Sequence, residues 1–116
     1  MVFNWRDYYT LAQALAKYEN YEAALRSVVS RAYYAAFCIA RNKALAQGLE
    51  IRKDESVHKQ VIQYYRRNPN TSKMGKELDE LRDDRVKCDY YNKVSQPIKL
   101  AILSLKRSKR ILDFFP

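Results

Sequence analysis

One arginine stands where an apolar side chain is expected, in the segment from residue 74 to residue 91. The residues of one helical face recur there at alternating steps of four and three, and they are Met74, Leu78, Leu81, Arg85 and Cys88. A guanidinium on such a face must be paired or solvated, because a buried and uncompensated charge costs several kcal/mol. Arg85 is therefore the first candidate for a functional residue.

Two neighbours of Arg85 extend this candidate site. Arg82, Arg85 and Asp89 are spaced by three and four residues, so they share one side of a helix, and Arg85 and Asp89 are close enough to pair. In a structural interpretation, the Arg85–Asp89 pair only sets the packing of the helix. In a functional interpretation, Arg82 and Arg85 bind a phosphate in a cleft that Asp89 and Tyr90 also line.

A second notable run, from Ser30 to Phe37, precedes this segment by about fifty residues. Ser30, Tyr33 and Phe37 fall on one helical face, and Tyr34 lies beside it. Buried hydroxyl groups need hydrogen-bond partners, and Arg85 and Asp89 are the expected ones. The alternative is that these tyrosines only pack in the core.

His58 is the single histidine of the chain, so a multi-histidine zinc site is excluded, and the two cysteines lack the spacing of metal ligands. No glycine-rich phosphate loop and no spacing typical of a nucleophile with its base is present. We therefore expect neither a metal nor a cofactor. His58 either caps or packs a helix, or it acts as a general acid or base across a dimer interface.

The elements that must position these residues are expected to be helices. The chain has only two glycines and three prolines, whereas β-rich folds use both in their many turns. Apolar periodicity and end signals predict helices over residues 5–18, 20–47, 54–67, 71–91 and from about 95 onward. The fold class expected is all-α, an up-and-down antiparallel bundle of four to five helices, in one domain spanning residues 1–116.

Each expected helix also has a predicted inward face or cap. Asn4, and later Thr71 or Ser72, are predicted N-caps. The stripe of the second helix begins at Tyr21, and its middle is apolar around most of its circumference, which predicts the central position. The last helix is expected to turn Ile98, Ala101, Ile102, Leu105 and Leu112 inward, while the basic run 106–110 is interpreted as a solvated face.

The composition indicates an anionic partner. The formal net charge is +9, which favours contact with a nucleotide or nucleic acid, although a basic helical protein can also simply be soluble this way. No apolar run approaches the roughly 20 residues that span a bilayer, so no membrane association is expected. With no visible secretory signal and two cysteines, Cys38 and Cys88, expected to stay reduced, a cytoplasmic location is predicted.

Three blocks of this sequence resemble those of HEPN-domain proteins, in particular small prokaryotic members of that family. The first is the run from Ser30 to Phe37. The second is His58 to Ile62 followed by Tyr64, with Gln60 where a glycine is usual and Tyr64 where phenylalanine is usual. The third contains Leu78, Leu81, Arg85 and the pair Asp89-Tyr90. The blocks keep their order and spacing from about residue 26 to residue 91.

This resemblance implies a helical bundle that forms a homodimer and is often paired with a minimal nucleotidyltransferase, as in toxin–antitoxin systems. An exposed tyrosine, Tyr90 or Tyr91, would then be a possible acceptor of a nucleotidyl group from that partner. Many HEPN proteins are metal-independent ribonucleases with an arginine four to six residues before a histidine. Here the histidine positions after Arg82 and Arg85 hold other residues.

Three hypotheses follow for the function. The leading one is a non-catalytic or weakly catalytic module that binds RNA, a nucleotide or a nucleotidyltransferase. Its cleft would include Ser30, Tyr33, Tyr34, Arg82, Arg85, Asp89 and Tyr90. The second is a ribonuclease in which Arg82 or Arg85 stabilises the phosphorane and His58 is the base. The third is a structural subunit.

Overall fold

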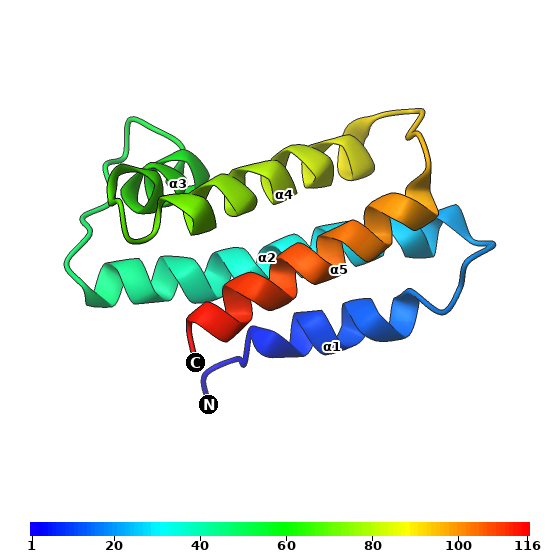
Figure 1. Cartoon of the computed structure of the whole chain (residues 1–116), viewed down its shortest axis with the longest axis horizontal. Helices are drawn as coiled ribbons and strands as arrows, with labels where there is room; N and C mark the ends of the chain where they lie inside the picture. Colours follow the sequence, from blue (N-terminus) through cyan, green and yellow to red (C-terminus); the bar gives the residue numbers. More distant parts are fainter.

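The computed structural model describes all residues from 1 to 116 and contains five helices and no strand. The helices are α1 (Arg6–Leu15), α2 (Glu22–Ala46), α3 (Val57–Arg67), α4 (Ser72–Tyr90) and α5 (Pro97–Phe114). The predicted all-α bundle is therefore confirmed. Figure 1 shows α1, α2, α4 and α5 running lengthwise, with α3 seen nearly end-on across one end. In chain order the lengthwise helices alternate in direction.

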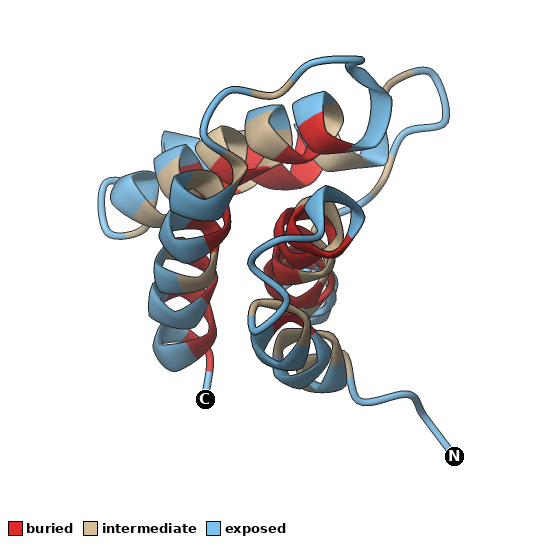
Figure 2. Ribbon diagram, turned by 90° about the vertical axis from the view of Figure 1, so that its right-hand side faces the viewer, coloured by how far each residue is buried: buried red, intermediate tan, exposed pale blue.

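The centre of the bundle is α2, which packs against all four other helices. Six of its alanines are buried, and they are Ala24, Ala32, Ala35, Ala36, Ala40 and Ala44. Small side chains let neighbouring backbones approach closely, and Figure 2 shows the buried residues of the helices turned toward one another. The predicted central position of this helix is confirmed. Tyr21, however, is exposed, because the helix begins only after it.

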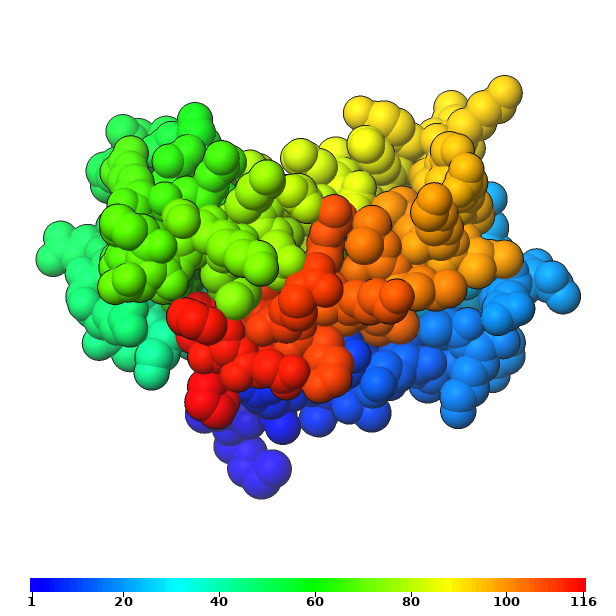
Figure 3. All heavy atoms as spheres, viewed as in Figure 1, coloured from blue at the N-terminus to red at the C-terminus, as the bar shows by residue number.

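Small residues also set the contact between α2 and α5. Ser104 and Ser108 of α5 are fully buried, and the Ser108 hydroxyl donates to the carbonyl oxygen of Ala32 at 2.8 Å. In Figure 3, α5 lies along the surface between α4 and α1. The predicted inward face was wrong for Ile98 and Ile102, which are 43% and 50% exposed, because α5 turns this narrower face of small residues toward α2.

Several predicted helix ends were wrong by a few residues. α1 ends at Leu15 instead of residue 18, and α3 begins at Val57 instead of residue 54. The Asn4 side chain does accept a hydrogen bond from the Arg6 N–H at 3.1 Å. Thr71 precedes α4 without capping it, because its hydroxyl donates instead to the carbonyl oxygen of Tyr65 at 2.7 Å.

Gly75 is the residue at which α3 and α4 approach most tightly. A Cβ atom added there would lie 2.7 Å from the backbone nitrogen of Arg66. Real Cβ atoms do not approach a backbone this closely, so glycine is required by packing. The end of α3 therefore packs tightly on the start of α4, and these two helices carry His58 and the arginines of interest.

The start of α1 meets the end of α5, although the two chain ends point to different sides of the molecule in Figure 2. The Arg6 guanidinium donates to the carbonyl oxygens of Leu112 and Phe115, so the start of α1 is tied to the end of α5. None of the five helices is both long and apolar enough to pass through a bilayer.

Candidate functional site

Tyr33 and His58 form the centre of the candidate site. Tyr33 is fully buried on α2, and its hydroxyl shares a hydrogen bond of 2.5 Å with Nδ1 of His58 at the start of α3. The imidazole also stacks on Phe37, with ring centroids 4.3 Å apart. The predicted partners of the Tyr33 hydroxyl, Arg85 and Asp89, were therefore wrong, because the α2–α3 contact supplies a nearer acceptor.

Arg85 lies on the other side of Tyr33. Its guanidinium carbon is 5.4 Å from the centre of the Tyr33 ring and 5.3 Å from that of Tyr34, which is cation–π distance. Only 8% of Arg85 is exposed, and its Nε has no hydrogen-bond partner. A buried donor without a partner is costly, so this arginine is held in place with hydrogen-bonding capacity left over.

The predicted pair between Arg85 and Asp89 is present but long, with Nη1 3.4 Å from Oδ2. The Ser30 hydroxyl donates to the same carboxylate oxygen at 3.4 Å, as expected from the sequence. One loosely held carboxylate, itself partly open to solvent, is the only anionic side chain that pairs with Arg85. The charge of Arg85 is thus incompletely compensated within the chain.

The site is electrostatically positive around the imidazole. Burial, followed by the charges of Arg82, Arg85 and Arg41, lowers the pKa of His58 to about 4. Burial also raises the pKa of the Tyr33 hydroxyl well above its usual value. At neutral pH both groups are therefore uncharged, and the guanidinium groups provide the charge of the site.

The neutral imidazole has two possible roles, which depend on its hydrogen bond with Tyr33. When the tyrosine hydroxyl donates to Nδ1, the proton of His58 is on Nε2, which then donates to a ligand oxygen. When Nδ1 carries the proton, Nε2 is free to accept one. The same geometry therefore supports either binding of an oxyanion or transfer of a proton.

Four arginines surround this centre, and we call Arg31, Arg41, Arg82 and Arg85 the arginine cluster. Except for Arg85, none of them forms an ion pair with a carboxylate. Arg31 and Arg41 line the same groove as His58, and the charge of Arg82 acts on both Tyr33 and His58. The cluster collects positive charge at one place on the molecule.

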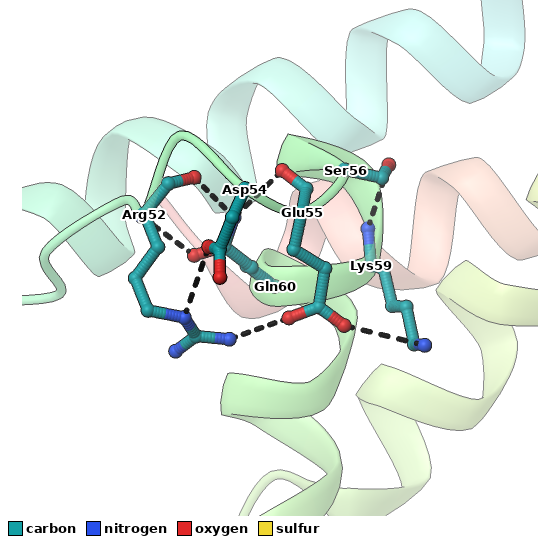
Figure 4. Close-up of polar contacts among 6 residues, drawn as sticks. All are labelled: Arg52, Asp54, Glu55, Ser56, Lys59 and Gln60. Carbon is teal, nitrogen blue, oxygen red and sulfur yellow. Dashed lines mark hydrogen bonds and ion pairs between the residues drawn. The ribbon is translucent and has the colours of Figure 1, made fainter.

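The loop before α3 determines where His58 lies. Gln60 is buried, and its amide accepts from the Arg52 N–H at 2.8 Å and donates to the carbonyl oxygens of Arg52 at 2.8 Å and Glu55 at 3.0 Å (Figure 4). Ser56 accepts a hydrogen bond from the Lys59 N–H and so caps the helix. These bonds hold the turn immediately ahead of His58.

The structure brings most of the predicted site residues together. These are Ser30, Tyr33, Tyr34, His58, Arg85 and Asp89, with Arg82 close enough for its charge to act on the imidazole. Tyr90 is the exception, because it is 73% exposed at the end of α4 and forms no hydrogen bond or ring contact with the others. In the single chain it lies outside the site.

Sequence reasoning missed Arg31, Arg41 and Gln60. A signal for the two arginines does exist, because Arg31, Tyr34, Cys38 and Arg41 are spaced by three, four and three residues on the helix face beside Tyr33. No comparable signal places Trp5 and Tyr8 beside His58, because their position depends on how α1 packs against α2. The importance of Gln60 depends on loop backbone that has no periodic pattern.

The two cysteines are free and buried. Burial raises the pKa of both thiols, that of Cys88 to about 11, so neither is a reactive thiolate at neutral pH. No three residues among histidines, cysteines, aspartates and glutamates are grouped so that they could hold a metal ion.

The structure is a five-helix bundle whose central helix presents tyrosines to a histidine and a group of arginines. The HEPN domain model matches residues 7–115, which is nearly the whole chain. The chain therefore belongs to the HEPN family. No curated protein and no solved structure matches it.

Proposed function

We propose that this HEPN module binds the phosphate groups of RNA or of a nucleotide at the arginine cluster, around Tyr33 and His58. The observation that carries the proposal is Arg85, which is buried, stacked on two tyrosines and left with an unpartnered Nε. Because Nε is enclosed, a phosphate would bind through the outer Nη donors of this guanidinium, which match phosphate oxygens.

The charge distribution supports the same proposal. The chain has a formal net charge of +9, and within the arginine cluster only Asp89 provides a compensating carboxylate. Phosphate contacts contribute most of the affinity of nucleic-acid-binding proteins, and arginine is suited to them because it donates in a planar fork. Neutral His58 adds a hydrogen-bonding group that does not oppose an anion.

The direct test compares the binding of a short fluorescent single-stranded RNA to two double variants, by fluorescence anisotropy. Arg82→Gln/Arg85→Gln removes two charges from the cluster. Arg66→Gln/Arg110→Gln removes two charges elsewhere, from arginines that are paired with Asp79 and Glu77 at 2.8 and 2.7 Å. Each arginine of the cluster is expected to contribute roughly tenfold in affinity, because a hydrogen bond to a charged group is worth about 1.5 to 3 kcal/mol.

The expected result is an affinity loss of about 100-fold for the cluster variant and a much smaller loss for the control, with both proteins folded by circular dichroism. Equal losses in the two variants would mean that only the total charge matters. No loss in the cluster variant would mean that Arg85 is architectural. Either of these results would contradict the proposal.

Cleavage of RNA without a metal is the second candidate function, and the position of His58 favours it. The 2′-hydroxyl oxygen would attack the adjacent phosphorus while its proton passes to Nε2 of His58. The bond to the 5′-oxygen would break, and that oxygen would take a proton from water. Arg82 and Arg85 would stabilise the charge on the phosphorane. A strongly lowered pKa makes the imidazole a weak base, which predicts slow cleavage.

Incubating a single-stranded RNA with the protein in excess chelator tests this second function. Fragments that end in a 2′,3′-cyclic phosphate, and that disappear with His58→Gln, would support it. If the protein binds the RNA and the RNA stays intact, cleavage is excluded and binding remains the function of the module.

Assembly with other chains is a further part of the proposal, supported by membership of the HEPN family. We propose that the module forms a homodimer and pairs with a minimal nucleotidyltransferase. Tyr90 and Tyr91 are exposed at the end of α4 and are accessible to such a partner. Light scattering tests the dimer. Intact-mass measurement after incubation with the partner and ATP tests nucleotidyl transfer, and an unchanged mass would contradict it.

A further inference from the structure

A groove of about 510 Å³ lies directly beside His58 and is lined by Arg31 and Arg41 of the arginine cluster, but not by Arg82 or Arg85. It is formed by α1, the middle of α2 and the start of α3. Its lining residues are Trp5, Tyr8, Arg31, Tyr34, Phe37, Cys38, Arg41, Val57 and His58. Its volume is within the range of small-ligand sites.

Aromatic rings line this groove, and the guanidinium groups of two arginines lie against three of them. The guanidinium carbon of Arg31 lies 4.6 Å from the centre of the Tyr8 ring and 5.2 Å from that of Tyr34. That of Arg41 lies 5.5 Å from the Trp5 ring. Flat rings and guanidinium planes are the surfaces on which nucleobases stack, and such stacking does not require a particular sequence.

The polar groups of the groove are mainly donors. No carboxylate and no side-chain amide lines it, while Arg31 and Arg41 provide two guanidinium groups that cannot accept a hydrogen bond. A base with two adjacent acceptors therefore fits better than a base that presents an amino group next to N7. Guanine offers O6 and N7 side by side, whereas adenine pairs N7 with an N6 amino donor.

The largest hollow of the molecule, about 730 Å³, is less suitable for a nucleotide. It lies between the start of α2 and α5, far from the arginine cluster in the fold, and its lining carries Lys99 and Lys106 as well as Glu19 and Glu22. The two carboxylates offset the charge of the two lysines, and no aromatic ring lines this hollow. The smaller groove beside His58 combines stacking rings with uncompensated positive charge.

We propose that the groove beside His58 is a nucleobase subsite that prefers guanine, and that it holds the base of a nucleotide whose phosphate binds Arg82 and Arg85. This inference rests on the proposed phosphate-binding function and adds the identity of the base. The stacking surfaces are Trp5, Tyr8 and Tyr34. Arg41 is the residue that reads the acceptor edge. Its Nε and Nη2 donate to Asn42 Oδ1 at 3.1 and 3.0 Å, so Nη1 and the second hydrogen of Nη2 are the donors left for a base.

Trp5 makes the subsite directly observable, because it is the only tryptophan of the chain and it lines the groove. The experiment titrates the full-length protein with GMP, AMP, UMP, CMP and inorganic phosphate, and follows tryptophan fluorescence. GMP is expected to quench the fluorescence at a concentration roughly tenfold lower than AMP, since one bidentate contact discriminates by about this factor. Phosphate alone is expected to leave the fluorescence unchanged.

Two single variants assign the preference to its residue. Arg41→Gln is expected to bring the half-saturating concentrations of GMP and AMP together. Arg67→Gln is the matched control, because Arg67 also lacks an ion pair but lies at the end of α3, away from the groove. It is expected to keep the tenfold preference. Both variants are measured after their thermal unfolding midpoints have been compared with that of the wild type.

The possible failures are distinguishable. Unchanged fluorescence with every nucleotide, or equal quenching by GMP and AMP in the wild type, overturns the guanine subsite. If RNA affinity still depends on Arg82 and Arg85 in that case, phosphate binding stands without it. If RNA affinity does not depend on these two arginines, the proposed function itself is wrong.

Discussion

The charge of a buried arginine is balanced differently on the two sides of α4. On the side facing α5, Arg107 of α5 is held by Glu80 at 2.6 Å and by Asp84 at 3.1 Å, so its charge is fully matched. On the side facing α2, Arg85 has only Asp89 at 3.4 Å, and its Nε has no partner. Both guanidinium groups are largely buried, and only the first has its charge balanced within the fold.

This difference separates arginines that support the fold from arginines available to a ligand. The basic run 106–110 was predicted to be a solvated face, and that was wrong for its centre. Only 17% of the Arg107 side chain is exposed, and Ser108 is fully buried. Arg110 is also paired, with Glu77 at 2.7 Å. The run with the highest density of positive charge is therefore a less suitable anion site than the dispersed arginine cluster.

Disturbing the contact between α3 and α4 should give the largest effect. Gly75→Ala places a methyl group against the backbone of Arg66 at the α3–α4 crossing. We expect the free energy of unfolding to fall by about 3 kcal/mol, because neither backbone can move without loss of packing. RNA affinity should fall too, since the added methyl group displaces α3, which carries His58, relative to α4, which carries Arg82 and Arg85. Urea unfolding measures the first effect and anisotropy the second.

A change only on the side of α4 that faces α5 should lower the stability of the fold without lowering the affinity for RNA. Arg107→Gln leaves Glu80 and Asp84 without their partner, and Asp84 is largely buried. The free energy of unfolding is expected to fall by about 2 kcal/mol, while RNA affinity changes less than twofold. Urea unfolding and anisotropy on the same preparation check both values. If binding fell as much as in Arg82→Gln/Arg85→Gln, the contrast between the two sides would be wrong.

The fold could be predicted from the sequence because its signals are local. Helical periodicity and scarce glycine and proline predict five helices, and the alanine-rich stretch of residues 24–44 predicts the central one. The predictions were wrong where the packing of a neighbouring helix decides which face of a helix is buried. Ile98 and Ile102 look inward-facing by periodicity, yet α5 packs through Ser104 and Ser108. Such a choice depends on which face fits the partner helix.

The candidate site could be predicted only in part, for the same reason. The positions of Arg85 and Asp89 follow from spacing within one helix, and their pairing was foreseen correctly. The hydrogen bond between Tyr33 and His58 joins residues 25 positions apart on two helices, and periodicity contains no information about it. The groove around Trp5 depends in addition on the packing of α1 against α2.

The dependence of stability on pH provides a smaller test of the side of α4 that faces α2, where His58 and Arg85 lie near Tyr33. Because the pKa of His58 is lowered in the folded protein, the unfolded chain binds its proton first, and stability is lost as the pH falls from about 6.5 toward 4. His58→Gln keeps an acceptor for Tyr33 but does not titrate. Its loss of stability between pH 7 and pH 4 should be smaller by on the order of 1 kcal/mol, since His58 is only half-buried. Chemical unfolding across this pH range measures the difference, and parallel curves would contradict it.

The most direct test of the central claim follows the imidazole of the single histidine by NMR, with and without a bound single-stranded RNA. In the free protein, the guanidinium groups and burial should place the titration midpoint of His58 near pH 4. Bound phosphates should neutralise the arginine cluster and raise the midpoint toward the ordinary value of about 6.5. A midpoint near 6.5 in the free protein, or one that does not move when RNA binds, would contradict the assignment of this cluster as the phosphate site.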